Sequence, residues 1–199
     1  MTIDFINRRS LGAVLTLAVV LLCGCGASKK REAGIQSLQK MQASVHGLGI
    51  LVSAGVTKQE YSQRLEDVLL KVGDINETEK QTIADFPPKE QPTVEAAYAH
   101  ISQSLEAYEK ARDYFGDDFT SFECQDGCSF FPENQYDQIK QQFPTIEPLA
   151  FGPEDTWYSN KGHVVYRSYL RSDMLHALWN VAQNEDTAAE KIIRQINDN

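Results

Sequence analysis

Apolar residues recur every three or four positions in four separate stretches, and this periodicity constrains the fold more than any other feature. The stretches cover residues 32–53, 61–72, 94–115 and 166–181, and their spacing matches the 3.6-residue turn of an α-helix. A helix with one apolar stripe must bury it against another element. Strand-like alternation nowhere extends beyond a few residues. The sequence therefore predicts an all-α protein, an up-down bundle of about four main helices.

The links between these stretches carry residues that stop and start helices. Gly55 is suited to end the first helix, and Thr57 with Glu60 matches a capping box at the start of the second. A gap this short predicts an antiparallel helical hairpin. Pro92 suits the first position of the third main helix, where its missing N–H costs nothing, and Gly116 is expected to end that helix.

The remaining helical signals are shorter or less regular. Residues 76–86 and 133–143 are each expected to form one short helix. The helical pattern returns at His163; residues 163–166 could also form a short strand, but a helix is the favoured interpretation. Residues 184–186 are expected to interrupt this last helix, and Thr187 to start its final segment.

Between residues 116 and 162 the helical pattern is lost, and this irregular insertion is expected to pack over one end or one side of the bundle. The segment 114–169 holds 13 of the 19 aromatic residues of the chain. They form either a satellite core that attaches the insertion, or a surface for a hydrophobic ligand, a peptide-like ligand or a partner protein. The candidate contact residues are Phe119, Phe122, Phe130, Phe131, Trp157 and Tyr158.

The same insertion contains two closely spaced cysteines, Cys124 and Cys128. An oxidising compartment and the intervening Asp-Gly turn favour a disulfide between them, which would stabilise the loop by about 2 kcal/mol. Small-loop disulfides can also be redox-active. Against that alternative, the spacing is not Cys-x-x-Cys, and the neighbouring carboxylates Glu123 and Asp126 would raise a thiol pKa. A structural disulfide is the favoured interpretation.

The N-terminus has the pattern of a targeting segment. Arg8 and Arg9 precede an uncharged apolar run over residues 11–22, which is too short for a helix to cross about 30 Å of hydrocarbon. A positive flank, a short apolar run and small residues are typical of a signal peptide. The alternatives are an ordinary secretory signal that is cut nearby, which leaves a free protein, and an uncleaved anchor.

Leu22, Gly24 and Cys25 provide an aliphatic residue three positions before a cysteine and a small residue directly before it. In this motif the chain resembles a bacterial lipoprotein. The resemblance implies cleavage before Cys25 and a diacylglyceryl group on its thiol, with fatty acyl chains such as palmitate; Cys23 fits the modified position less well. Two acyl chains hold a protein stably on a membrane without any spanning helix.

This resemblance sets the expected organisation and location. Residues 1–24 form the signal peptide, 25–31 a short membrane tether and 32–199 a single helical domain. The protein is expected to be lipid-anchored in the cell envelope, and the glycine after the modified cysteine favours the periplasmic face of the outer membrane if the host is diderm. The basic residues 29–31 could add contacts to anionic lipid.

The charge argues against nucleic acid as a partner. The chain has 19 basic and 28 acidic side chains and a formal net charge of −9. Removing residues 1–24, which carry Asp4, Arg8 and Arg9, makes it −10. Phosphate binding needs clustered Lys and Arg, and an acidic surface is more simply explained by solubility.

The chain lacks the motifs of common enzymes and metal sites. Gly-x-Ser-x-Gly, His-Glu-x-x-His and a phosphate-binding glycine loop do not occur, so neither a catalytic site nor a cofactor is predicted. No two of the four histidines stand at ligand spacing, so no metal site is predicted. His46 and His100 both lie near the middle of predicted helices and could meet inside the bundle.

Three hypotheses about function follow. The first is a membrane-anchored envelope lipoprotein that acts as a non-enzymatic binding or scaffolding module for another envelope protein. The second is a periplasmic small-molecule or peptide binding or sensing protein, with a pocket between the insertion and the third and fourth main helices. The third is a thiol-disulfide redox protein that uses Cys124 and Cys128.

Overall fold

The computed structural model describes the backbone of residues 9–73, 75–115, 130–150, 155–159, 162–166 and 168–198. Side chains are described for residues 28–73, 75, 77–115, 134–150 and 171–198. In this part of the chain the body is helical, as predicted. Its helices are α1 (Arg9–Ala54), α2 (Lys58–Val72), α3 (Ile75–Ile83), α4 (Gln91–Arg112), α5 (Glu133–Gln142) and α6 (Arg171–Asp198).

Helices α1 and α2 form the predicted hairpin. Gly55 adopts a φ of 84°, a conformation that side-chain-bearing residues rarely take, and this allows the chain to leave α1. The capping box is present: the Thr57 side chain accepts from the Glu60 N–H, and the Glu60 carboxylate accepts from the Thr57 N–H. The Thr57 hydroxyl also donates to the Glu60 carboxylate at 2.7 Å. This bond, and then the one from the Thr57 N–H, stabilise the charged form and lower the pKa of the exposed Glu60 carboxyl.

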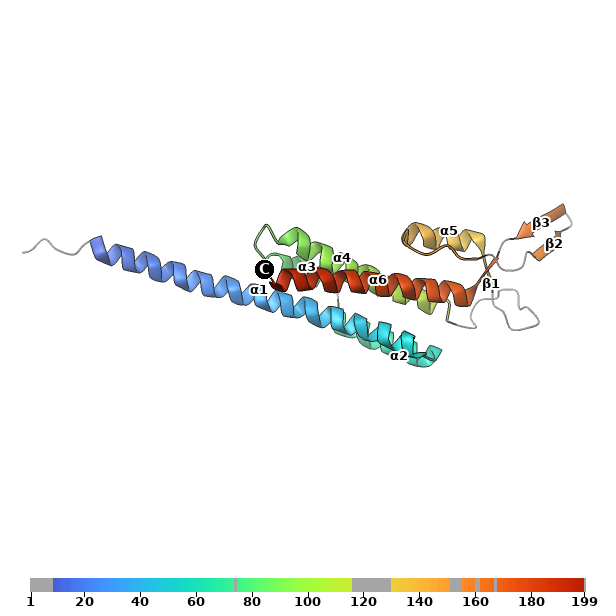
Figure 1. Ribbon diagram of the computed structural model, residues 1–199, viewed down its shortest axis with the longest axis horizontal. Helices are drawn as coiled ribbons and strands as arrows, with labels where there is room; N and C mark the ends of the chain where they lie inside the picture. The colour runs from blue at the N-terminus through green and yellow to red at the C-terminus, as the bar shows by residue number, and fades with distance from the viewer. Residues whose placement is uncertain are drawn as a thin grey trace, which may run out of the picture.

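The apolar stripes predicted from the sequence form the core. Helix α6 packs along α4 over most of its length and also against α1, while α2 contacts α1 and α4. Figure 1 shows α4 and α6 side by side, with α1 and α2 on one side of this pair and α5 on the other. The largest fully buried side chains of the four main helices are Leu38, Val45, Leu48, Tyr61, Leu65, Val68, Val94, Tyr98, Ile101, Tyr108, Met174 and Leu178.

Four short strands lie between α4 and α6. β1 (Phe130–Pro132) pairs antiparallel with β4 (Ser168–Leu170), and Phe130 stands opposite Leu170. β2 (Asp155–Ser159) pairs antiparallel with β3 (Gly162–Tyr166), and Trp157 stands opposite Val164. We call residues 116–170, which make up most of the segment between the end of α4 and the start of α6, the excursion. Its described strands project from one end of the bundle (Figure 1).

Two expectations for the C-terminal third are wrong. The segment from His163 forms strands β3 and β4, so the excursion continues to Leu170 and α6 begins only at Arg171. The β-branched pair Val164–Val165 suits a strand, and cross-strand pairing overrides the helical spacing. Residues 184–186 do not interrupt α6, which runs unbroken to Asp198 because two of these polar side chains bond to neighbouring helices.

Helix α1 continues through the predicted cleavage position and the predicted tether. It runs from Arg9 to Ala54, and its N-terminal half extends beyond the other helices (Figure 1). Within the part of the chain that the structure describes, no helix combines the length and apolar character needed to cross a bilayer. The backbone of Cys25 lies in this helix, and nothing in the structure tests its modification.

Candidate functional site

The residues predicted from sequence to contact a ligand or partner belong to the excursion, and the structure describes only some of them. Phe130 and Phe131 lie in β1, and Trp157 and Tyr158 lie in β2. The structure therefore places these four positions in two separate strand pairs. The described residues do not include Phe119, Phe122, Cys124 and Cys128. The disulfide between the two cysteines therefore stays a prediction.

The two segments that flank the excursion, at the end of α4 and at the start of α6, meet at a buried arginine. Arg171 is the first residue of α6 and only 5% exposed, and its Nη2 donates to the carbonyl oxygen of Asp113 at 2.7 Å. Asp113 follows the last turn of α4. The next residue, Tyr114, is also buried; burial raises its pKa to about 12, as does nearby Asp113, while the charge of Arg171 opposes the shift. Both ends of the excursion are thus fixed to one point of the bundle.

An aromatic cluster packs Phe115, which leads from the end of α4 towards the excursion, against the bundle. Phe115 stacks on Tyr61 of α2 with ring centroids 5.2 Å apart, and its ring lies 5.6 Å from that of Trp179 of α6. The Tyr61 hydroxyl donates to the carbonyl of Tyr108 at 2.7 Å. Burial is the main reason that the pKa of Tyr61 is raised well above its ordinary value. These contacts join α2, α4 and α6 directly below the excursion.

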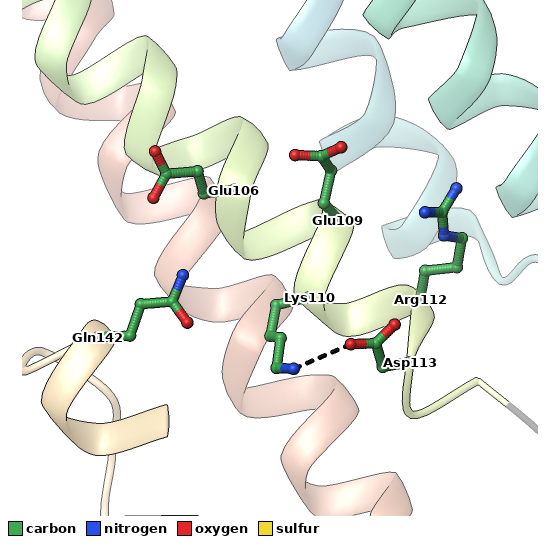
Figure 2. A pocket seen from close by; sticks show the side chains of 6 residues that line it. All are labelled: Glu106, Glu109, Lys110, Arg112, Asp113 and Gln142. Carbon is green, nitrogen blue, oxygen red and sulfur yellow. Dashed lines mark hydrogen bonds and ion pairs between the residues drawn. The ribbon is translucent and has the colours of Figure 1, made fainter. Parts of the chain in front are cut away.

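An open depression of about 270 Å³ lies beside the C-terminal end of α4. Figure 2 shows its lining: the last turns of α4 and one residue of α5. Lys110 pairs with Asp113, three residues further along the chain, at 2.9 Å. The lining residues are Glu106, Glu109, Lys110, Arg112, Asp113 and Gln142. The depression is polar and mixed in charge.

The two central histidines do not meet, contrary to one expectation. His46 of α1 places Nδ1 2.7 Å from Oδ2 of Asp186, while His100 of α4 places Nδ1 2.5 Å from Oε2 of Glu185. Consecutive residues of α6 point in different directions, about 100° apart, so each carboxylate reaches a different neighbouring helix. Gln42 donates a second hydrogen bond to Asp186 at 3.0 Å. These pairs join α6 to both helices beside it.

Asp186 gives the fold a definite pH dependence. Burial raises the pKa of this carboxyl above its ordinary value of 3.8, although hydrogen bonds from His46 and Gln42 oppose the shift. Between the unfolded and the raised folded pKa, the folded state binds more protons, so lowering the pH through this window stabilises it.

We therefore expect wild type to gain stability relative to Asp186→Asn as the pH falls from neutral towards 3.8, the ordinary value for this carboxyl. The gain is limited to about 1.4 kcal/mol per pH unit. Urea unfolding at four pH values measures it, and curves that stay parallel, or a larger gain by the variant, would contradict the assignment.

The end of the bundle nearest Cys25 is tied together by Arg31. Its Nε donates to Glu90 Oε2 at 2.7 Å, and its Nη2 donates to the Ile196 carbonyl in the last turn of α6 at 2.6 Å. Of the three basic residues 29–31, Arg31 is thus engaged within the fold. Lys30 lies 3.5 Å from Asp85 with an exposed side chain, and Lys29 is exposed.

Comparison with known proteins adds no assignment: no protein-family model, curated protein or solved structure matches this chain. Among the described side chains, no group of three or more His, Cys, Asp or Glu is placed to hold a metal ion. Sequence reasoning missed Arg171, because the last helix was expected to begin at His163. A basic residue at the start of a helix is ordinarily disfavoured by the helix dipole, and this signal appears only once α6 is seen to begin at residue 171.

Proposed function

We propose that this protein is a lipid-anchored, non-enzymatic protein of the cell envelope that holds the excursion away from the membrane to bind a partner protein. The anchor rests on the resemblance of Leu22–Cys25 to a lipoprotein cleavage motif. The binding role rests on the concentration of aromatic residues in the excursion, because aromatic side chains are enriched at protein interfaces.

One observation carries the proposal: the anchored end and the base of the excursion lie at opposite ends of α6. Arg31, six residues after Cys25, bonds to Ile196 near the end of this helix, and Arg171 at its start bonds to Asp113. From residue 171 to residue 196 the helical rise gives a separation of about 38 Å. A bundle standing on its lipid anchor would therefore present the excursion well beyond the headgroups.

Site-specific photo-crosslinking in the lipid-anchored protein tests this role. A benzophenone amino acid at Tyr158, in β2, is expected to give one adduct of constant mass with an envelope protein. The matched control carries the probe at Lys191, an exposed position of α6 nearer the anchored end, and is expected to give no such adduct. The same adduct from both positions, or none from Tyr158 in folded protein, would overturn the proposal.

The depression between α4 and α5 supports a second candidate, a small-molecule or peptide binding protein. It lies between the third main helix and the excursion, close to where such a pocket was expected. Its lining offers carboxylates beside two cations, which suits a zwitterionic or short peptide ligand. Saturable binding of dipeptides that is lost in Glu106→Gln but kept in Glu95→Gln, an exposed change elsewhere on α4, would favour this candidate over the first.

A further inference from the structure

The two ends of the segment that contains the excursion are joined by one side chain, that of Arg171. The chain leaves α4 at Asp113 and returns to the bundle at Arg171, and these two residues are joined by the 2.7 Å hydrogen bond from the guanidinium to the carbonyl. A charge-assisted hydrogen bond thus joins the residue that follows α4 to the residue that begins α6, at the two ends of the segment that contains the excursion.

A buried arginine is well suited to this position. The last carbonyls of an α-helix lack partners within the helix and carry its partial negative charge, so a cation placed against them is stabilised. Arg171 supplies that cation to the end of α4 from the first residue of the neighbouring helix. At 5% exposure, its guanidinium is largely shielded from competing water.

The contact continues directly into the excursion. Leu170, the residue before Arg171, pairs with Phe130, so the β1–β4 ladder extends to the residue that directly precedes α6 in the chain. β1 leads without a gap into α5, whose Tyr136 and Ile139 are buried. Arg171 is thus the residue at which the β1–β4 ladder passes into α6.

We propose that Arg171 is a positioning residue, which fixes the β1–β4 ladder and α5 in one orientation on the end of the α4–α6 pair. The benefit of this fixed orientation rests on the proposed function. An excursion that is already held in one orientation would bind a partner without the entropic cost of becoming ordered on binding. Its test requires neither partner nor lipid, so it can fail independently of that function.

Hydrogen exchange followed by mass spectrometry on the full chain tests the proposal. In Arg171→Met, peptides covering 130–142 are expected to exchange about ten-fold faster, the change that corresponds to losing one hydrogen bond of a charged group. Peptides covering 35–53 and 94–108 should keep wild-type rates. Arg171→Lys retains a cation and should restore part of the protection. Lys110→Met removes the exposed ion pair to Asp113 in the same turn and should change neither region.

The outcomes separate positioning from general stabilisation. Faster exchange confined to 130–142, with partial rescue by lysine, supports the proposal. Unchanged exchange in that region, or an equal loss of protection throughout the bundle, overturns it. If Arg171→Met does not fold, Arg171→Lys alone decides the question: a local increase in exchange with an unchanged urea midpoint supports positioning, and a lowered midpoint with uniform exchange does not.

Discussion

Replacing Cys25 by serine is expected to abolish acylation and to leave the signal peptide attached. In the lipoprotein resemblance the modified cysteine becomes the new N-terminus, so wild type isolated from membranes should begin at Cys25 and carry fatty acyl mass. Each buried CH₂ contributes about 0.8 kcal/mol to membrane binding, and two acyl chains together hold a protein stably. Intact-mass spectrometry reads both changes, because the variant should retain residues 1–24 and lack acyl mass.

Cys23→Ser is the matched control for this experiment. Cys23 lies two residues earlier in the same helix, and Leu22 rather than a small residue precedes it. The control is expected to be acylated and cleaved as in wild type. Loss of acyl mass in the Cys23 variant but not in the Cys25 variant would move the anchor by two residues. A wild-type product without acyl mass would remove the anchor and the proposed function together.

Gly34→Ala is expected to destabilise the protein by about 1–3 kcal/mol, the usual range for overpacking a filled core. A Cβ at this position would lie 2.6 Å from Cε2 of Phe86 and 3.1 Å from Cγ2 of Thr82. Both residues are buried, so neither can move away without disturbing the turn that leads from α3 to α4. The closeness of this turn to α1 therefore depends on the absence of a side chain at Gly34.

Gly47→Ala, in the same helix, should have the opposite effect. Its Cβ would approach only Nη2 of Arg64, at 3.5 Å, the far end of a flexible side chain. The gain in helix propensity should then stabilise the protein by up to about 1 kcal/mol. Urea unfolding of both variants, with m values equal to that of wild type, measures the difference. Equal effects of the two substitutions would show that helix propensity alone, not packing, accounts for both.

Local chemistry in the sequence predicted much of the bundle. The capping box at Thr57 and Glu60 and the stop at Gly55 need only the residues beside them, and both are present. Periodicity identified the buried face of each main helix, since one apolar stripe allows only one way of facing a core. It also found the short helix α5, whose bounds differ from the prediction by one residue.

The failures share a cause: each was decided by pairing between elements, which the helical spacing of one segment does not show. The described residues of 163–170 show helical spacing but form strands, because β3 pairs with β2, directly before it in the chain, and β4 pairs with the more distant β1. His46 and His100 were expected to meet, but each pairs with a different carboxylate of α6. The local sequence pattern of a helix does not indicate which other helices will pack beside it.

The sequence by itself determined which faces of the helices are buried, where the first hairpin turns and that the body is acidic and helical, because these properties follow from the spacing and chemistry of neighbouring residues. Only the tertiary structure decided that Arg31 and Arg171 close opposite ends of the bundle and that a turn packs on Gly34. Those features arise from contacts between residues 48 to 165 positions apart, and such contacts exist only after the helices have packed.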